Sequence, residues 1–143
     1  MKNLKDTINL LVKIIEAVPN AGQVFLNDIY QLNKMQTVKY PAYCITQQPH
    51  TQTEDTMSFN FTLLYVARLN DAGTNRIDVQ STAISVLKQI IDTLKEQQVL
   101  TNSNVIYTTF NERFNDNCAG AFVDISVIYN ADECGEPLEL KLD

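Results

Sequence analysis

The sequence predicts an α+β domain in which helices pack on a mostly antiparallel sheet. Apolar residues recur at helical spacing in two segments, one near the N-terminus and one in the middle of the chain. Two further segments alternate apolar and polar residues, as strands with one buried face do, and each has a shorter partner beside it. The predicted order is therefore an N-terminal helix, a β-hairpin, a long helix and a second β-hairpin.

The N-terminal helix is predicted at about residues 3–17. Its apolar residues are spaced so that they share one face: Leu4, Ile8, Leu11, Val12 and Ile15. Pro19 and Gly22 break this pattern and end the helix. Lys13 and Glu16 interrupt the apolar run and no small-residue cleavage site follows, so an amphipathic helix is favoured over a signal peptide.

The next segment, residues 23–32, fits two interpretations that the sequence leaves open. A short helix would place Phe25, Ile29 and Leu32 on one face. A strand would instead use the alternation of Val24 and Leu26.

The first predicted hairpin joins a strand at 40–46 to a longer strand at 57–69. The shorter strand starts near Pro41, because proline is tolerated at the first position of a strand. The longer strand carries its apolar residues at every second position: Met57, Phe59, Phe61, Leu63 and Tyr65. Toward its end Leu64 and Val66 make both faces apolar, so we expect that end to be covered on both sides.

The long middle helix is predicted at residues 76–97. Asn75 is the expected N-cap, and Asp78 stands at the third helical position, where it can reciprocate. The apolar stripe consists of Ile77, Ile84, Leu87, Ile91 and Leu94, widened by Ala83 and Ile90. A stripe this wide must lie on a sheet.

Two more strands follow that helix, at about 105–110 and 121–129. The last strand alternates its apolar residues, Ala121, Val123, Ile125, Val127 and Tyr129, with Asp124 and Ser126 on its other face. Gly120 is expected to mark a bulge or a sharp bend at the entry to this strand. The whole chain is predicted to be one domain, with a core at about 4–130 and an acidic, extended C-terminal arm at about 131–143.

Both hairpins are predicted to have polar connections. Residues 47–55 are polar apart from Pro49, which indicates a flexible hairpin tip or a longer loop. Residues 111–118 indicate a polar bend between the last two strands.

Composition sets limits on the function. The chain has 143 residues and a net charge of −6, and no cluster of basic residues offsets that charge, which argues against tight nucleic-acid binding. No stretch approaches the length and hydrophobicity of a transmembrane helix, so synthesis in the cytoplasm is the expectation. The 3 cysteines lack CxxC spacing and are predicted to be reduced thiols.

The residues that could carry chemistry are scattered, and no catalytic, cofactor or metal site is predicted. His50 is the only histidine and stands in a polar segment without other metal ligands near it in sequence. Ser85 and Lys88 match the S-x-x-K pattern of serine acyltransferases, but the supporting S-D-N and K-T-G motifs are absent. The carboxylates lack EF-hand spacing, and no phosphate-binding glycine motif occurs.

The ordered features resemble a known family. The likeness covers residues 4–130 and rests on the segments VFLNDIYQLN, KYPAY, FNFTLLYVARL, IDVQSTAISVLKQII and TTFNERFNDNCAGAFVDISV. Its more specific parts are the Tyr40-Pro41 strand start and the Asn-Cys-Ala-Gly bend before the last strand. In these features the chain resembles small neck proteins of tailed bacteriophages, of the tail-terminator or head–tail connector type, as found in phages of gut Bacteroidota.

That resemblance implies a structural virion protein. Its expected form is a homo-oligomeric ring, sixfold or twelvefold, that joins portal, connector and tail-tube proteins in the neck and lets DNA pass without binding it specifically. Neither a cofactor nor a membrane is expected. The residues expected at subunit contacts are Gln47, Pro49, His50, Thr51 and Asp55 in the first connection and Asn111, Arg113, Asn115 and Asp116 in the second.

Two other classes of function compete with the ring. A small ligand-binding or adaptor module with a ferredoxin-like sheet is the main alternative, because fold alone does not exclude it. An enzyme would need a pocket with perturbed titratable groups, for which Ser85 and His50 are the candidates.

Overall fold

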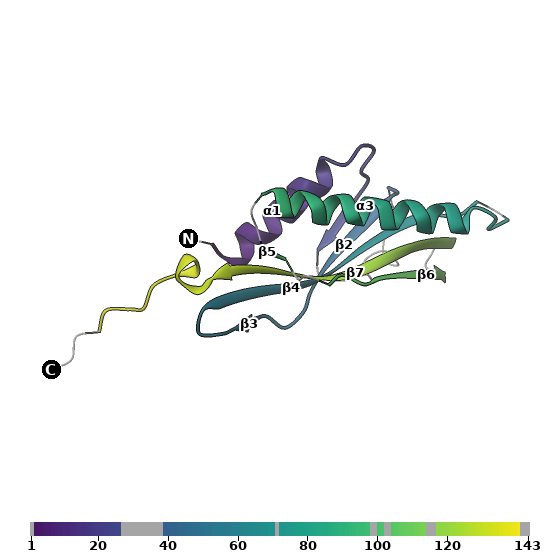
Figure 1. Cartoon of the computed structure of the whole chain (residues 1–143). Coiled ribbons are helices and arrows are strands. Elements are labelled where there is room, and N and C mark those ends of the chain that lie inside the picture. The colour runs from purple at the N-terminus through teal and green to yellow at the C-terminus, as the bar shows by residue number, and fades with distance from the viewer. Residues whose placement is uncertain are drawn as a thin grey trace.

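The chain forms two layers, with helices on one face of a sheet (Figure 1). This computed structural model describes residues 2–26, 39–70, 72–97, 100–101, 104–113 and 117–140. The sheet is mixed and has seven strands, so the predicted α+β class is confirmed. Part of the ambiguous segment, residues 27–32, lies outside the described residues, while residues 24–26 form a strand.

The sheet is built around two long central strands. Its strands are β1 (Val24–Leu26), β2 (Ala42–Gln47), β3 (Thr51–Gln52), β4 (Thr56–Arg68), β5 (Leu100–Thr101), β6 (Tyr107–Arg113) and β7 (Asn117–Asn130). The order is β1-β2-β4-β7, and then β7 pairs with β5 and β6 along its other side. Strand β3 pairs with the first residues of β4. Only the β1–β2 pairing is parallel among the described strands.

Two helices cover one face of this sheet. Helix α1 (Leu4–Glu16) begins where the Asn3 side chain accepts a hydrogen bond from the Asp6 N–H at 2.8 Å, which satisfies one of the free donors at a helix start. Helix α3 (Arg76–Glu96) lies along β4 and β7 (Figure 1). Its buried residues are Ala83, Leu87, Ile90, Ile91 and Leu94. These belong to the predicted apolar stripe, and they form the main core with the inward residues of β2, β4 and β7.

The prediction for the first turn of α3 was wrong at two residues. Ile77 belongs to the predicted stripe, but 66% of it is exposed. Asn75 stands at the N-cap but makes no side-chain capping bond, because its Oδ1 accepts from the Asn70 N–H at 2.9 Å instead. The turn before the helix therefore uses the side chain that was expected to cap it.

The second face of the sheet is apolar only at one end. A smaller cluster of buried residues lies there: Phe25, Ala42, Cys44, Leu64, Val66 and Cys118. Leu64 and Val66 are the residues that were predicted to make the end of β4 buried on both faces, and their burial confirms that prediction. Cys44 and Cys118 are buried in this cluster without a disulfide, and the Cys118 thiol donates to the Tyr40 hydroxyl at 3.4 Å.

Three boundary predictions need correction. The polar bend predicted at 111–118 is shorter, because β6 continues to Arg113 and β7 starts at Asn117. Gly120 makes no bulge: it pairs in continuous register with Val66 on one side and Phe110 on the other. The C-terminal arm is not extended throughout, since Ala131–Cys134 form a 3-10 turn.

Two buried tyrosine hydroxyls differ in their hydrogen bonding. The Tyr129 hydroxyl lies 3.1 Å from the Thr7 hydroxyl in a buried hydrogen bond. The Tyr43 hydroxyl is buried and has no hydrogen-bond partner among the described residues, and its ring packs edge-on against Tyr65 at 5.3 Å between centroids. Burial, with a smaller contribution from Tyr65, raises the pKa of Tyr43 from 10.0 to about 12.

The same substitution should therefore have opposite effects at these two sites. Tyr43→Phe removes a buried hydroxyl without a partner and should raise the free energy of unfolding by about 1 kcal/mol. The Thr7 hydroxyl donates to the Asn3 carbonyl at 2.9 Å, so it accepts from Tyr129; Tyr129→Phe removes that buried bond and should lower the free energy of unfolding by about 1 kcal/mol. Urea unfolding at pH 7 measures both changes.

Alkaline pH provides an independent check on Tyr43. Its pKa is raised in the folded state, so the unfolded chain loses the proton first and stability falls as the pH rises from 10.0 toward about 12. The loss should be about 2 to 3 kcal/mol for a shift of this size. Tyr43→Phe should remove that loss; if the alkaline stability of the variant follows that of the parent, the Tyr43 hydroxyl is not buried as described.

Candidate interaction surface

The predicted contact residues fall into two groups at opposite ends of the sheet. Gln47, Pro49, His50, Thr51 and Asp55 lie beside the first half of β4, where β3 pairs with Met57 and Ser58. Asn111 and Arg113 lie on β6, whose end is level with Arg68 at the far end of β4 through the pairing of β7. Arg68 is ten positions after Ser58 in β4, so the distance between them along the strand is about 33 Å at the usual rise per residue. Asn115 and Asp116 lie outside the described residues.

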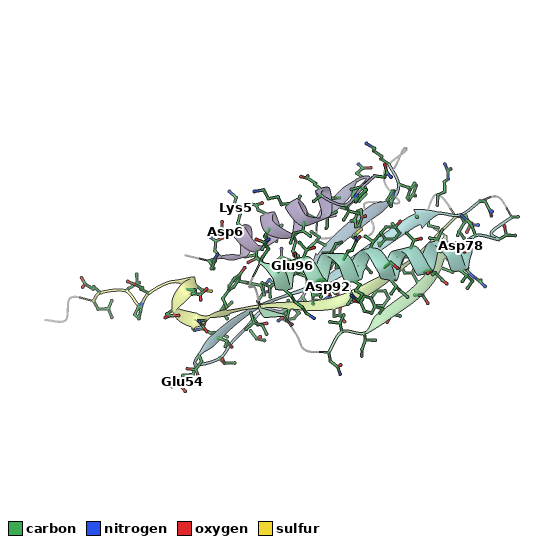
Figure 2. The ribbon with its side chains drawn as sticks, turned by 45° about the horizontal axis from the view of Figure 1, so that its top comes forward. Lys5, Asp6, Glu54, Asp78, Asp92 and Glu96 are labelled. Carbon is green, nitrogen blue, oxygen red and sulfur yellow. The ribbon has the colours of Figure 1, made fainter. Side chains whose placement is uncertain are left out.

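Figure 2 illustrates this separation. Glu54, at the tip of the β3–β4 hairpin, lies at one end of the molecule, and Asp78, near the start of α3, lies toward the other. The two groups of predicted contact residues therefore cannot form a single site within one chain.

The first group is more ordered than the sequence predicted. Thr51 and Gln52 form strand β3, where a flexible tip or loop was expected. A tight turn follows, in which the Thr53 N–H donates to the Thr56 carbonyl at 2.9 Å. The Asp55 carbonyl accepts from the Ala131 N–H at 2.8 Å, which fixes the tip to the C-terminal 3-10 turn. This hairpin therefore presents Glu54 on a supported backbone.

His50 lies between β2 and β3 and bonds to β4. Its Nδ1 accepts a hydrogen bond from the Asn60 backbone N–H at 3.0 Å, which is a bond that a neighbouring strand would ordinarily make. The neutral ring then carries its proton on Nε2, which donates to the Gln47 side chain at 3.1 Å. Its edge packs against Phe59 and Phe61, with ring centroids 5.5 and 5.7 Å away. His50 thus acts as a structural residue of the sheet.

Replacing His50 should test this role. His50→Ala leaves the Asn60 N–H without its acceptor and should lower the free energy of unfolding by about 1 kcal/mol. The Asn60 amide should also exchange with solvent faster, which hydrogen exchange measured by NMR detects. Gln47→Ala is the control, because it removes the acceptor of the Nε2 bond and leaves the bond from the Asn60 N–H to Nδ1 in place, so exchange at Asn60 should not become faster. Equal exchange rates at Asn60 in His50→Ala and the parent would contradict the assignment.

A polar network covers the part of the sheet that faces away from the helices. The Asn60 amide oxygen accepts from Ser58 at 2.8 Å and from Ser126 at 2.7 Å, and its nitrogen donates to the Pro49 carbonyl at 2.7 Å. Beside it, the Thr62 hydroxyl donates to Asp124 at 2.6 Å. The bond to the Pro49 carbonyl holds the segment before β3 against β4. Asn60, Thr62, Asp124 and Ser126 also line an open hollow of about 570 Å³.

A larger hollow lies where the residues before α1 meet the 3-10 turn that follows β7. Its volume is about 690 Å³, and its apolar lining includes Leu4, Met57 and Phe59, with Lys2 at the same site. Residues 134–137 form another part of the lining. The Lys2 N–H donates to the Glu133 carbonyl at 2.6 Å, so the N-terminal residues are attached to the C-terminal turn. We call this cavity the root hollow.

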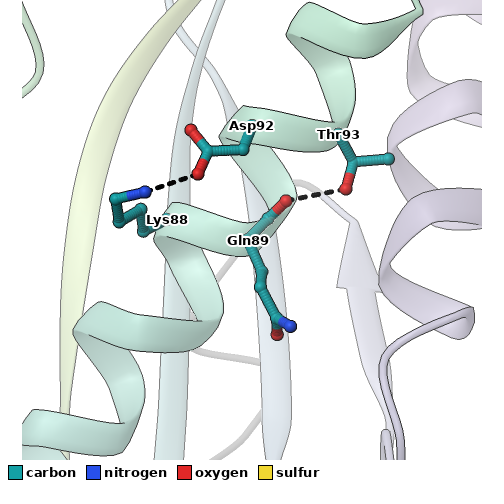
Figure 3. Close-up of polar contacts among 4 residues, drawn as sticks. All are labelled: Lys88, Gln89, Asp92 and Thr93. Atoms are coloured by element: carbon teal, nitrogen blue, oxygen red, sulfur yellow. Dashed lines mark hydrogen bonds and ion pairs between the residues drawn. The ribbon is translucent and has the colours of Figure 1, made fainter.

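Neither of the residues with potential catalytic chemistry on α3 is arranged for it. Ser85 and Lys88 are both exposed on the outer side of the helix. The Lys88 amine is 2.6 Å from an Asp92 oxygen, as Figure 3 shows, and this hydrogen bond raises the pKa of Lys88. A lysine that serves as a general base needs the opposite shift. Lys88 and Asp92 form an ordinary surface ion pair one helical turn apart.

The thiol of Cys134 is the remaining reactive group near a cavity. It is partly buried and lines the root hollow. Burial raises its pKa, and the neighbouring carboxylates of Glu133 and Asp132 add to that rise. A thiol held in its protonated form is a poor nucleophile, so this position does not indicate nucleophilic catalysis.

Within the described ranges, no three His, Cys, Asp or Glu side chains come close enough together to hold a metal ion. Over the same parts of the chain, no helix combines the length and hydrophobicity needed to cross a membrane.

Sequence reasoning missed the polar network and the root hollow. The alternation of Ser58, Asn60 and Thr62 was a signal for a wet face on β4, but their partners depend on the register with β7. Nothing in the sequence indicated that residues 2–4 and 131–137 would line one hollow.

Comparison with known proteins adds no family assignment. No protein-family model matches the chain, and a search of curated proteins returns no significant match.

Proposed function

We propose that this chain is a structural subunit of a ring in the neck of a tailed-bacteriophage particle, as a tail terminator or a head–tail connector. In this role it joins portal-side and tail-side proteins around a channel. Two expectations from the sequence support this role. One is the order of a helix, a hairpin, a long helix and a second hairpin, and the other is the resemblance of residues 4–130 to neck proteins of that kind.

The observation that carries the proposal is the placement of the two hairpins. The β3–β4 tip and the β6–β7 hairpin lie about 33 Å apart along β4, so each can face a different neighbour. Among the described strands, β6 is paired along one side only, which leaves an edge that can receive a strand from another copy. A contact between two unlike surfaces closes into a ring when the rotation between copies is right.

Electrostatics supports the same role. The net charge is −6, and Glu54, Asp55, Asp132 and Glu133 are exposed at one end of the molecule. If this end lines the channel, its carboxylates repel the phosphates of DNA, so the DNA can pass without being held. Membranes have no part in this proposal.

The test is self-assembly and its loss in a matched pair of variants. We expect native mass spectrometry of the full-length chain to show a sixfold or twelvefold ring. Asn111→Arg places a bulky charge on exposed β6 and should abolish the ring, while Gln89→Arg, on the exposed side of α3, should not. Circular dichroism should be unchanged in both. A strict monomer at high concentration, with and without the neck partners, would contradict the proposal.

The competing function, a monomeric ligand-binding or adaptor module, has one observation in its favour. The root hollow is large enough for a small molecule, and its lining combines apolar side chains with Lys2, Asp132 and Glu136. A monomer whose thermal stability rises with one metabolite would support this alternative in place of the ring.

A further inference from the structure

The end of the chain carries leucines with no apolar surroundings. Leu138 is 86% exposed and Leu140 is 73% exposed, on a segment that leaves the body of the molecule (Figure 1). Gly135 has a φ of 140°, a conformation that side chains other than glycine rarely adopt, and there the chain turns away from the 3-10 turn. We call residues 135–140 the leucine arm.

The leucine arm has the pattern of a strand with one apolar side. Leu138 and Leu140 are two residues apart, so in an extended chain they point to the same side, while Glu139 points to the other. An isolated exposed leucine is ordinary on a protein surface. Two on one side of a projecting segment, alternating with a carboxylate, are what an extended segment needs to add to another surface.

The root hollow offers the complementary surface. Its lining is apolar at Leu4 and Met57, which pack against the main core but remain partly exposed. Lys2 provides a positive charge, and it is held there by its backbone bond to Glu133, with its amine 6.0 Å from the centre of the Tyr129 ring. The carboxylates of Asp132 and Glu136 also line the hollow, so the surface matches the arm in its apolar side chains and not in its charge.

The arm does not fill the hollow of its own chain. Glu136 and Pro137 form part of the lining, and the chain leaves the hollow at the next residue, Leu138, which is exposed. Among the described residues, neither Leu138 nor Leu140 lines the hollow.

We propose that the leucine arm of one copy lies in the root hollow of a second copy, with Leu138 and Leu140 against Leu4 and Met57. This inference rests on the proposed ring for the presence of a neighbour, and it adds a second contact between copies to the one proposed for the hairpins.

Disulfide capture between two distinguishable full-length chains tests the contact. The donor chain carries Cys134→Ser and Leu138→Cys, and the tagged receiver keeps its native Cys134, which lines the hollow. A disulfide forms only when the two Cβ atoms come within about 4.5 Å. We expect donor–receiver dimers on a non-reducing gel after mild oxidation above neutral pH, and linked peptides by mass spectrometry. The control donor has Cys134→Ser and Glu139→Cys, and it should form roughly tenfold less of this product.

Assembly provides the second measurement. The double variant Leu138→Ser/Leu140→Ser should raise the concentration for half-assembly about tenfold or more, because two apolar side chains lose their burial. A ring that forms without donor–receiver disulfides, and that the leucine variants leave unchanged, would overturn the arm contact and leave the ring standing. Disulfide-linked pairs that never grow into a ring would support the arm contact and overturn the ring. A monomer without cross-links would overturn both.

Discussion

Gly120→Ala should unfold this protein or lower its free energy of unfolding by about 3 kcal/mol or more. Gly120 lies in the middle of the sheet, paired with Val66 of β4 and Phe110 of β6. A methyl group at this position would lie against the carbonyl oxygen of Tyr65, with the Tyr65 carbonyl carbon at 2.9 Å and the Phe110 ring at 3.1 Å. Approach this close is possible only without a Cβ atom.

The obstacle is backbone, so it cannot rotate away. Tyr65 belongs to β4, which is hydrogen-bonded to β2 on one side and to β7 on the other. A shift of its carbonyl therefore disturbs two ladders at once. Equilibrium urea unfolding followed by circular dichroism measures the loss.

Gly73→Ala is the control for this prediction. Gly73 has a φ of 69°, and no atom lies within 4 Å of a Cβ built there, so alanine meets backbone strain without a steric obstacle. The expected cost is about 1 kcal/mol. If the two glycine variants are equally stable, the strands around Gly120 are farther apart than described.

The contrast at Gly120 also marks what the sequence could not provide. A glycine entering a strand predicted a bulge, because that is a common reason for its presence there. The strand partners on both sides decide between a bulge and a close approach, and those partners are 54 and 10 residues away in the chain. The local pattern contains neither distance.

The elements with a repeated pattern were predicted best. Phe59, Phe61 and Leu63 alternate with polar residues over the strand that became the centre of the sheet. Strand β3 was not predicted because neither Thr51 nor Gln52 is apolar. The two residues pair with β4 where β4 extends beyond the end of β2. The backbone hydrogen bonds of β3 are made with the neighbouring strand β4, beside His50. The two residues of β3 therefore carry no pattern from which the strand could be predicted.

The candidate interaction surface follows the same division. The two connections were predicted from their polarity, and the described parts of both lie on hairpins at opposite ends of β4. Their distance from one another depends on the length of β4 and on its register with β7, which the sequence could not establish. The root hollow depends on a contact between Lys2 and Glu133, which are 131 residues apart in the chain.

Leu87→Asp should prevent folding, whereas Ile77→Asp on the same helix should be almost neutral. Leu87 is fully buried between α3 and the sheet, and a carboxylate there loses its hydration without a partner. The cost should be about 4 kcal/mol or more, which is a large part of the stability of a domain of this size. Ile77 is 66% exposed in the first turn of α3, so its replacement should change stability by no more than about 0.5 kcal/mol.

The direction of the small effect at Ile77 is also predictable. An acidic side chain in the first turn of a helix interacts favourably with the free backbone N–H groups there, which offsets the lost apolar contact. Thermal unfolding of Ile77→Asp and soluble yield of Leu87→Asp distinguish the two sites. Comparable loss in both would mean that the first turn of α3 packs on the sheet, as the periodicity alone predicted. If Ile77→Asp is stable but fails to assemble, the exposed isoleucine belongs to a contact between copies.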